Sequence, residues 1–144
     1  MKVLIAIDDS QFSKAALEAV IAQFNPRDTE VRVIHIVEPV AVSVPPQMAL
    51  GYTPELSDQM KQAQNLVERA AKTLRAMGFK ADTIVGKGDI REKILDFATE
   101  WHANAIVIGS HGRSGIRRFL LSSVPEFVAR NANCSVEIVR IPAA

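Results

Sequence analysis

The chain of 144 residues is long enough to bury a hydrophobic core in a single domain without disulfides or a structural metal. Its formal net charge of +1 provides no overall basic field, which argues against nucleic acid or a membrane surface as a partner. No signal peptide follows Met1 and no run of 18 apolar residues occurs, so we expect a cytoplasmic protein that does not span a membrane. The one cysteine, Cys134, fits a reducing compartment, and its apolar neighbours predict a buried thiol.

Apolar runs alternate with helical patterns along the chain. The first run ends at Asp8-Asp9-Ser10, where Ser10 is a suitable N-cap for the next helix. Glu38 to Thr53 contains three prolines and lacks periodicity, which predicts a loop and a candidate lid. Gly86-Lys87-Gly88 predicts a turn, and Asp89 to Glu92 is a capping box. The predicted strands are residues 3–7, 31–37, 81–85, 105–108 and 135–139, and the predicted helices are residues 10–24, 53–77, 89–98 and 124–131.

This alternation predicts one open α/β domain over residues 1–144, with a five-stranded parallel sheet of order 3-2-1-4-5 and helices on both faces. In such sheets a ligand binds beyond the carboxyl ends of the strands, where the strand order reverses. That point lies between the first and fourth strands. It brings Asp8-Asp9-Ser10 opposite residues 109–112, which are the most polar strand ends of the chain. We therefore expect the ligand between these two segments.

The stretch from Ile106 to Glu126 predicts a phosphate-binding loop. Gly109 and Gly112 allow the backbone to turn sharply with its N–H groups directed into the opening. Ser122 and Ser123 immediately precede a predicted helix, where a hydroxyl and the free N–H groups of the first turn both favour an anion.

Three arginines, Arg113, Arg117 and Arg118, add local positive charge to this loop. Two interpretations stay open for them, contact with phosphate or a solvated charged face. Ser123 to Glu126 can likewise be an anion site or a plain capping box. The chain has neither the Gly-x-Gly-x-x-Gly fingerprint after its first strand nor the Gly-Lys-Ser/Thr ending of a Walker motif, which disfavours a standard dehydrogenase or P-loop ATPase.

Four segments carry a resemblance to a known family: the opening strand with Asp8-Asp9-Ser10, the run Val33 to Val37, Gly109-Ser-His-Gly112, and the closing Val136 to Arg140. Over almost its full length the chain resembles the universal stress proteins. The nucleotide-binding branch of that family carries Gly, two residues, Gly, nine residues, then Gly and Ser or Thr. Gly109, Gly112 and Ser123 match this motif, and Ser122 stands in place of the third glycine. The resemblance implies a fold like that of the adenine-nucleotide alpha hydrolases.

The resemblance also implies a role for each matching position. The positions that would hold the adenine and ribose are Asp8, the backbone of Ile36, and Ile108 in the base pocket. Those that would pass beneath the ribose and the first phosphates are Gly109, His111 and Gly112. Those that would hold the outer phosphates are Ser122, Ser123 and the N–H of Val124, and Ser10 and Arg113 complete the predicted set.

Asp8 and Ser122 each have a second interpretation. Asp8 can simply cap the first helix or its turn, because aspartate is common in such turns. Ser122 keeps the N–H donor and adds a hydroxyl if its φ is negative, whereas a positive φ costs serine about 1 kcal/mol or more and spoils the cradle. Of the remaining histidines, His35 is expected in the core or at its edge and His102 at the surface near a helix end, too dispersed for a metal site.

The resemblance implies binding and signalling with at most slow hydrolysis, so the chain is expected not to be an enzyme. Asp8 and Asp9 are neighbours on an extended segment and point apart, so they do not form an acid–base pair. The favoured function is a stress-response regulatory module that binds ATP, with or without Mg²⁺. It would form a homodimer through the edge strand Val136 to Arg140. The alternatives are a dimeric interaction module without nucleotide, favoured by Ser122, and a small-molecule hydrolase.

Overall fold

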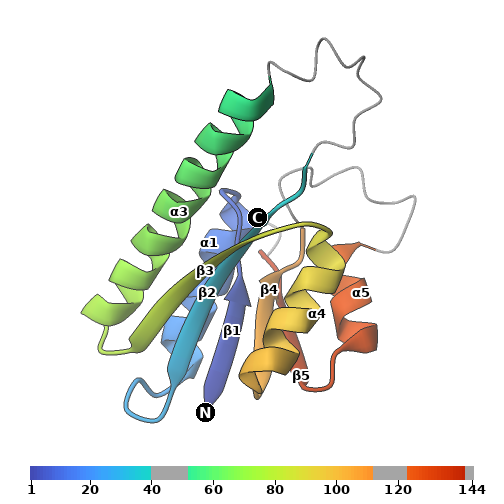
Figure 1. Cartoon of the computed structure of the whole chain (residues 1–144). Coiled ribbons are helices and arrows are strands. Elements are labelled where there is room, and N and C mark those ends of the chain that lie inside the picture. Colours follow the sequence, from blue (N-terminus) through green and yellow to red (C-terminus); the bar gives the residue numbers. More distant parts are fainter. Residues whose placement is uncertain (40–51, 112–122, 142–144) are drawn as a thin grey trace.

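The computed structural model describes residues 1–39, 52–111 and 123–141. Within these residues strands and helices alternate, as Figure 1 shows. The elements in chain order are β1 (Lys2–Ala6), α1 (Gln11–Gln23), β2 (Glu30–Val37), α3 (Tyr52–Ala76), β3 (Lys80–Lys87), α4 (Ile90–Trp101), β4 (Ala105–Gly109), α5 (Val124–Asn131) and β5 (Ser135–Val139).

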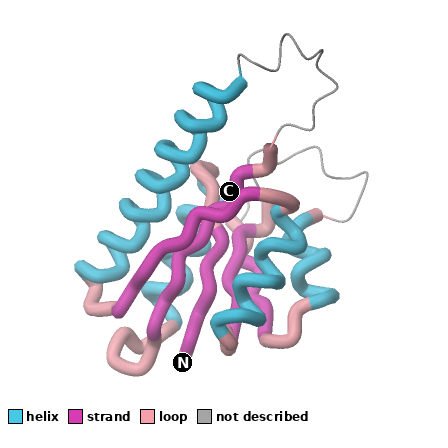
Figure 2. Tube along the Cα trace, viewed as in Figure 1, coloured by secondary structure: helices cyan, strands magenta, loops and turns pink. Residues whose placement is uncertain are grey.

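The strands form one parallel sheet in the order β3-β2-β1-β4-β5, which confirms the predicted topology. The central strand β1 pairs with β2 on one side and β4 on the other, with Ala6 opposite both Ile34 and Ile108. The direction of winding therefore reverses between β1 and β4, and the carboxyl ends of both strands lie at the same edge of the sheet. Figure 2 shows the sheet between its helices.

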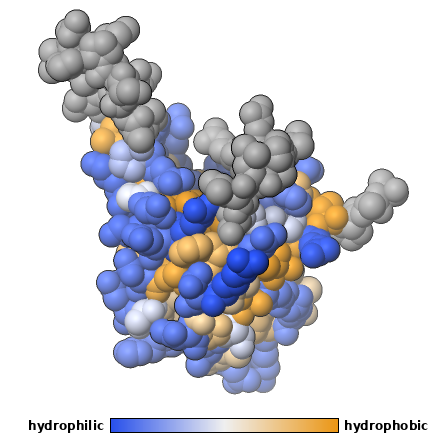
Figure 3. All heavy atoms as spheres, turned by 90° about the vertical axis from the view of Figure 1, so that its right-hand side faces the viewer, coloured by the Kyte–Doolittle hydropathy of each residue, from blue (hydrophilic) through white to orange (hydrophobic). Residues whose placement is uncertain are grey.

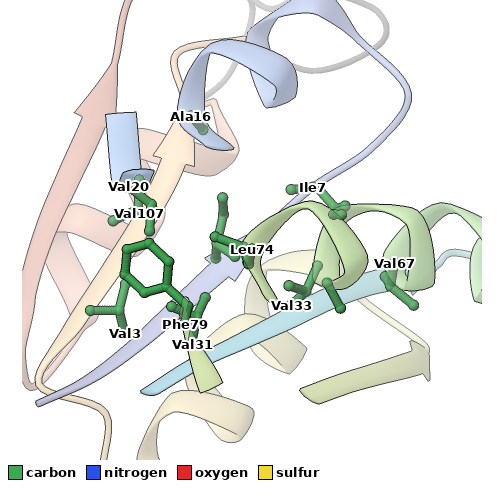
Figure 4. Packing of buried hydrophobic residues seen from close by; sticks show 13 residues of the cluster. Val3, Ile7, Ala16, Val20, Val31, Val33, Val67, Leu74, Phe79 and Val107 are labelled. Carbon is green, nitrogen blue, oxygen red and sulfur yellow. The ribbon is translucent and has the colours of Figure 1, made fainter. Parts of the chain in front are cut away.

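The core has two halves, one on each face of the sheet, because successive side chains of a strand point to opposite faces. Val3 and Ile5 of β1 pack in a cluster with α1 and α3, and Figure 4 shows the Phe79 ring beside Val3 in this half. Leu4 and Ala6 pack in the other half, under α4 and α5. The central strands are buried on both faces, which explains their continuous apolar sequences.

Three details differ from the prediction. β3 continues through Gly86 to Lys87, so the turn is confined to Gly88 at a φ of 139°. A side chain at Gly86 would place its Cβ 2.7 Å from Phe97 Cε2, so the glycine lets this ring of α4 lie close against the strand. The helix α3 begins at Tyr52, just before the predicted cap Thr53, and residues 40–51 of the predicted lid lie outside the described residues. Cys134 is only half-buried.

The outer edge of β3 is partly occupied by a side chain of the preceding helix. Arg75 Nε donates to the main-chain oxygen of Ala81 at 3.0 Å, and Arg75 Nη1 also pairs with Glu68 at 2.9 Å. The two ends of β3 carry exposed lysines, Lys80 and Lys87. Lysine at a sheet edge disfavours pairing with another strand.

Candidate functional site

A cleft of about 1550 Å³ opens at the carboxyl edge of the sheet, where β1, β2 and β4 end and α4 and α5 begin. This is the predicted place, between the first and fourth strands. Seven of the predicted site residues line it: Asp8, Ile36, Ile108, Gly109, His111, Ser123 and Val124. Ser10 is not among the lining residues, and Gly112, Arg113 and Ser122 lie outside the described residues, as do Arg117 and Arg118.

Asp8 connects the end of β1 to the start of α1. Its Oδ1 accepts hydrogen bonds from Ser10 N at 2.8 Å and from Ser13 Oγ at 2.9 Å, while its own N–H donates to Ser13 Oγ at 2.8 Å. Asp8 therefore closes the turn and also lines the cleft, so its two interpretations are compatible. Ser10 is the N-cap of α1, and its Oγ accepts from Ser13 N at 3.3 Å. This accounts for the place of Ser10 outside the cleft.

The main chain of Ile36 faces the cleft. In a parallel sheet successive residues bond alternately to the two neighbouring strands. Ile34 O accepts from Ile7 N on the β1 side and Val37 O accepts from Gly88 N on the β3 side, so Ile36 points toward β1. β1 has already ended at Ala6, and the last paired residue of β2 on that side is Ile34. The N–H and C=O of Ile36 thus form a donor–acceptor edge at the cleft.

The side chain of His35 bonds to the main chain of Ile7, the residue that follows β1. Its ring Nδ1 lies 2.6 Å from the main-chain oxygen of Ile7. Because a carbonyl oxygen only accepts, Nδ1 carries the proton of this hydrogen bond. His35 is half-buried and lines the cleft, so it belongs to the site region as well as to the edge of the core. The exposed His102, by contrast, ends α4 in the left-handed conformation at a φ of 58°.

Gly109 is required for packing, and its predicted role in a sharp turn is wrong. It is the last residue of β4, and its φ lies outside the left-handed region. A Cβ at this position would lie 2.7 Å from the main-chain oxygen of Phe12 and 2.8 Å from its carbonyl carbon. The absence of a side chain therefore lets the first turn of α1 pass directly against β4.

The segment after Gly109 is held on both sides. Ser110 N donates to Val139 O of β5 at 2.8 Å, which ties the rim of the cleft to the edge strand. Ser110 Oγ lies 3.0 Å from His111 Nδ1, and the His111 ring is 4.9 Å from the Phe12 ring. His111 therefore lines the cleft from the segment after β4, with its ring beside Phe12 of α1.

The first turn of α5 presents a main-chain donor to the cleft. Ser123 is its N-cap, with an extended backbone, and its Oγ accepts from Glu126 N at 3.4 Å. The N–H groups of a first helical turn have no partner within the helix. Pro125 has no N–H, so Val124, which lines the cleft, supplies the first free donor. The same turn therefore holds both the capping side chain of Ser123 and the N–H of Val124 at the cleft, so the two interpretations of this segment are compatible.

Sequence reasoning missed the contribution of α4. Ile90, Arg91 and Ile94 line the cleft from its first turns. The available signal was the Asp89 capping box, whose carboxylate accepts from the N–H groups of Arg91 and Glu92. A cap at the carboxyl end of a parallel strand places the following residues at the binding edge.

Two negative findings apply to the described part of the chain. Among residues 1–39, 52–111 and 123–141, no three His, Cys, Asp or Glu side chains are grouped so that they could hold a metal ion. None of the helices that the structure describes is both long and apolar enough to cross a membrane.

The sheet order and the cleft at its switch point define an α/β fold of the adenine-nucleotide alpha-hydrolase type. A model of the universal stress protein family matches residues 1–140, and the chain belongs to this family. The universal stress protein YxiE of Bacillus subtilis is 30% identical over 145 residues, which cover 96% of this chain and 98% of the relative. MJ0531 of Methanocaldococcus jannaschii is 32% identical, covering 98% of this chain and 82% of the relative.

Solved structures share this fold over nearly the whole chain. MJ0577 of Methanocaldococcus jannaschii superposes with a TM-score of 0.83 at 28% identity, covering 99% of this chain and 97% of that one. A family member from Arabidopsis thaliana with AMP bound has a TM-score of 0.69 at 19% identity, covering 99% and 93%. The Archaeoglobus fulgidus protein in complex with dAMP has a TM-score of 0.65 at 23% identity, covering 96% and 97%.

Proposed function

We propose that the cleft binds an adenine nucleotide, specifically ATP, with or without Mg²⁺. The chain would act as a cytoplasmic regulatory module of the stress response, through nucleotide-dependent association. The observation that carries this proposal is the meeting of three features in one cleft: the main-chain edge of Ile36, the carboxylate of Asp8 and the first turn of α5. The choice of adenine is supported by structures of the same fold that hold AMP and dAMP.

The three features match the three parts of a nucleotide. The N–H and C=O of Ile36 complement the ring nitrogen and amino group on the Watson–Crick edge of adenine, and the apolar side chains of Ile36 and Ile108 suit its faces. The carboxylate of Asp8 accepts hydrogen bonds from ribose hydroxyls. The N–H of Val124 and the dipole of α5 favour the phosphates.

A matched pair of variants at Val124 tests the phosphate end. Val124 is the first residue of α5, a position where proline is tolerated, so Val124→Pro removes one N–H and keeps the helix. Val124→Ala shortens the side chain to a methyl group and retains the N–H. We expect Val124→Pro to weaken ATP binding about 10-fold more than Val124→Ala in calorimetry, the loss of a hydrogen bond to a charged group. Adenosine binding should be equal in the two variants.

The nucleotide itself can be identified directly. Denaturation of the purified chain should release an adenine nucleotide that mass spectrometry identifies. No heat and no thermal shift with millimolar Mg-ATP would refute the proposal. Rapid ATP consumption in a turnover assay would instead favour the hydrolase alternative over a binding module.

Association is proposed to use β5. Figure 3 shows hydrophobic side chains gathered on the side of the molecule that carries β5 and α5. Val136 and Ile138 of β5 are only half-buried. Val139 O accepts from Ser110 N, so Val139 bonds toward β4 and the main chain of Ile138 faces outward. This outward edge suits pairing with the same strand of a second copy.

Proline at Ile138 tests this edge without removing a hydrogen bond between β4 and β5. Ile138→Pro removes an N–H that β4 does not use, and proline is tolerated in edge strands. A dimer in sizing chromatography should become a monomer with an unchanged circular dichroism spectrum. A persisting dimer would place the interface elsewhere. The same dimer without bound nucleotide would support the second candidate function, an interaction module that has lost its ligand through Ser122.

A further inference from the structure

The phosphates of the proposed ligand need positive charge on the face of the sheet that carries Ile36 and Ile108. Among the described residues four cationic side chains line the cleft: Arg69, Lys72, Arg75 and Arg91. The first three belong to α3, which packs on the opposite face. Arg91 of α4 lies on the same face as Ile36 and Ile108. Of these four cationic side chains, Arg91 is therefore the one that a ligand lying against Ile36 and Ile108 would meet.

Two contacts fix Arg91 at this wall. Its main-chain N–H donates to Asp89 Oδ1 at 2.9 Å, within the cap of α4. Its guanidinium lies 5.6 Å from the centre of the Phe127 ring. Phe127 belongs to the start of α5, since its N–H donates to Ser123 O at 3.0 Å. The guanidinium thus reaches from α4 to the first turn of α5, which carries the N–H of Val124.

The position of this guanidinium suits phosphate binding. A neighbouring aromatic ring favours the cation, and the planar guanidinium can bind phosphate through two N–H donors at once. Negative charge lies near this wall, because Asp89 and Glu92 are at the start of α4 and Glu126 at the start of α5, although none of these three side chains lines the cleft. The positive charge of Arg91 would offset their repulsion of a phosphate chain.

We propose that Arg91 is a phosphate-binding residue of the cleft and makes it prefer ATP over AMP and adenosine. This inference rests on the proposed nucleotide function. It adds a residue from α4 to a site otherwise built from β1, β2, β4 and α5.

The test compares Arg91→Ala and Arg91→Lys with Arg130→Ala. Arg130 is exposed in the last turn of α5 and does not line the cleft, so its loss removes the same charge at a distance. Calorimetric titrations use ATP, AMP, adenosine and inorganic triphosphate, and urea unfolding checks that each variant is folded.

Arg91→Ala should weaken ATP and triphosphate binding about 10- to 100-fold, the range for a lost hydrogen bond to a charged group, and leave adenosine within about twofold. Arg91→Lys should recover part of the loss, because lysine keeps the charge without the planar donors. Arg130→Ala should bind as the wild type does. An equal loss for ATP and adenosine, or no loss for ATP, overturns the role of Arg91 and leaves the proposed function standing. A folded wild type that binds none of the four ligands overturns both.

Discussion

Replacement of Gly109 by alanine tests the closeness of α1 to β4. The added Cβ would lie 2.7 Å from Phe12 O, and ordinary contact begins at 3.4 Å, so the first turn of α1 must move by about 0.7 Å. The obstructing atoms are main chain and cannot rotate away. Such overpacking costs about 1–3 kcal/mol of the free energy of unfolding, equivalent to a melting temperature lower by about 3–10 °C for a chain of this size.

The displacement also reaches the cleft. Phe12 precedes Ser13, whose hydroxyl bonds both the N–H and the carboxylate of Asp8. Moving this turn misplaces Asp8, so nucleotide affinity should fall together with stability. Urea unfolding followed by circular dichroism measures the first effect, and calorimetry with Mg-ATP measures the second.

Gly86→Ala is the matched control, because its added Cβ meets a side chain instead of main chain. The nearest atoms belong to the Phe97 ring, at 2.7 and 2.9 Å. The double variant Gly86→Ala with Phe97→Leu should recover stability, whereas no single side-chain change should rescue Gly109→Ala. A Gly109→Ala protein as stable as the wild type, with the same ATP affinity, would refute the close approach as the reason for glycine.

Three further predictions concern single side chains. Asp8→Asn keeps an oxygen acceptor for Ser10 and Ser13 but loses the charge, so the free energy of unfolding should fall by only about 1 kcal/mol. ATP and adenosine should both bind more weakly to this variant, and calorimetry showing unchanged adenosine affinity would contradict the prediction. Asp89→Ala removes the cap of α4 and should cost about 1 kcal/mol in urea unfolding, and an unchanged midpoint would show that the cap is dispensable. Burial raises the pKa of the Cys134 thiol, so at pH 8 the chain should react with iodoacetamide more slowly than free cysteine does. The reaction rate should increase as the pH rises toward that pKa. A rate at pH 8 equal to that of free cysteine would contradict the prediction.

The topology was predictable because each strand carries its own signal. β1 and β4 read as continuous apolar runs because they are buried on both faces, and serine and aspartate mark the helix starts at Ser10, Asp89 and Ser123. Once the strand order is fixed, the switch point follows from topology, and with it the positions of Asp8 and Gly109.

The rest depends on packing between elements that are distant in the sequence. From the sequence, a glycine before a polar loop can be needed either for a positive φ or for close packing of another element. Only the path of α1 shows that Gly109 is needed for close packing. Gly86 was assigned to a turn for a similar reason, since the Phe97 ring that requires it lies on another element. For Arg91 the sequence offers only its place after the Asp89 cap, because its contact with Phe127 depends on how α4 packs against α5.

If two copies pair through β5 as proposed, the hydrogen bond from Arg75 to Ala81 would disfavour the addition of further copies. It occupies an outward main-chain oxygen of β3, whereas β5 at the other end of the sheet keeps the outward main chain of Ile138. Two copies that pair through β5 would present only their β3 edges to further copies. Further growth would then depend on pairing between β3 edges, which the contact of Arg75 and the exposed lysines disfavour.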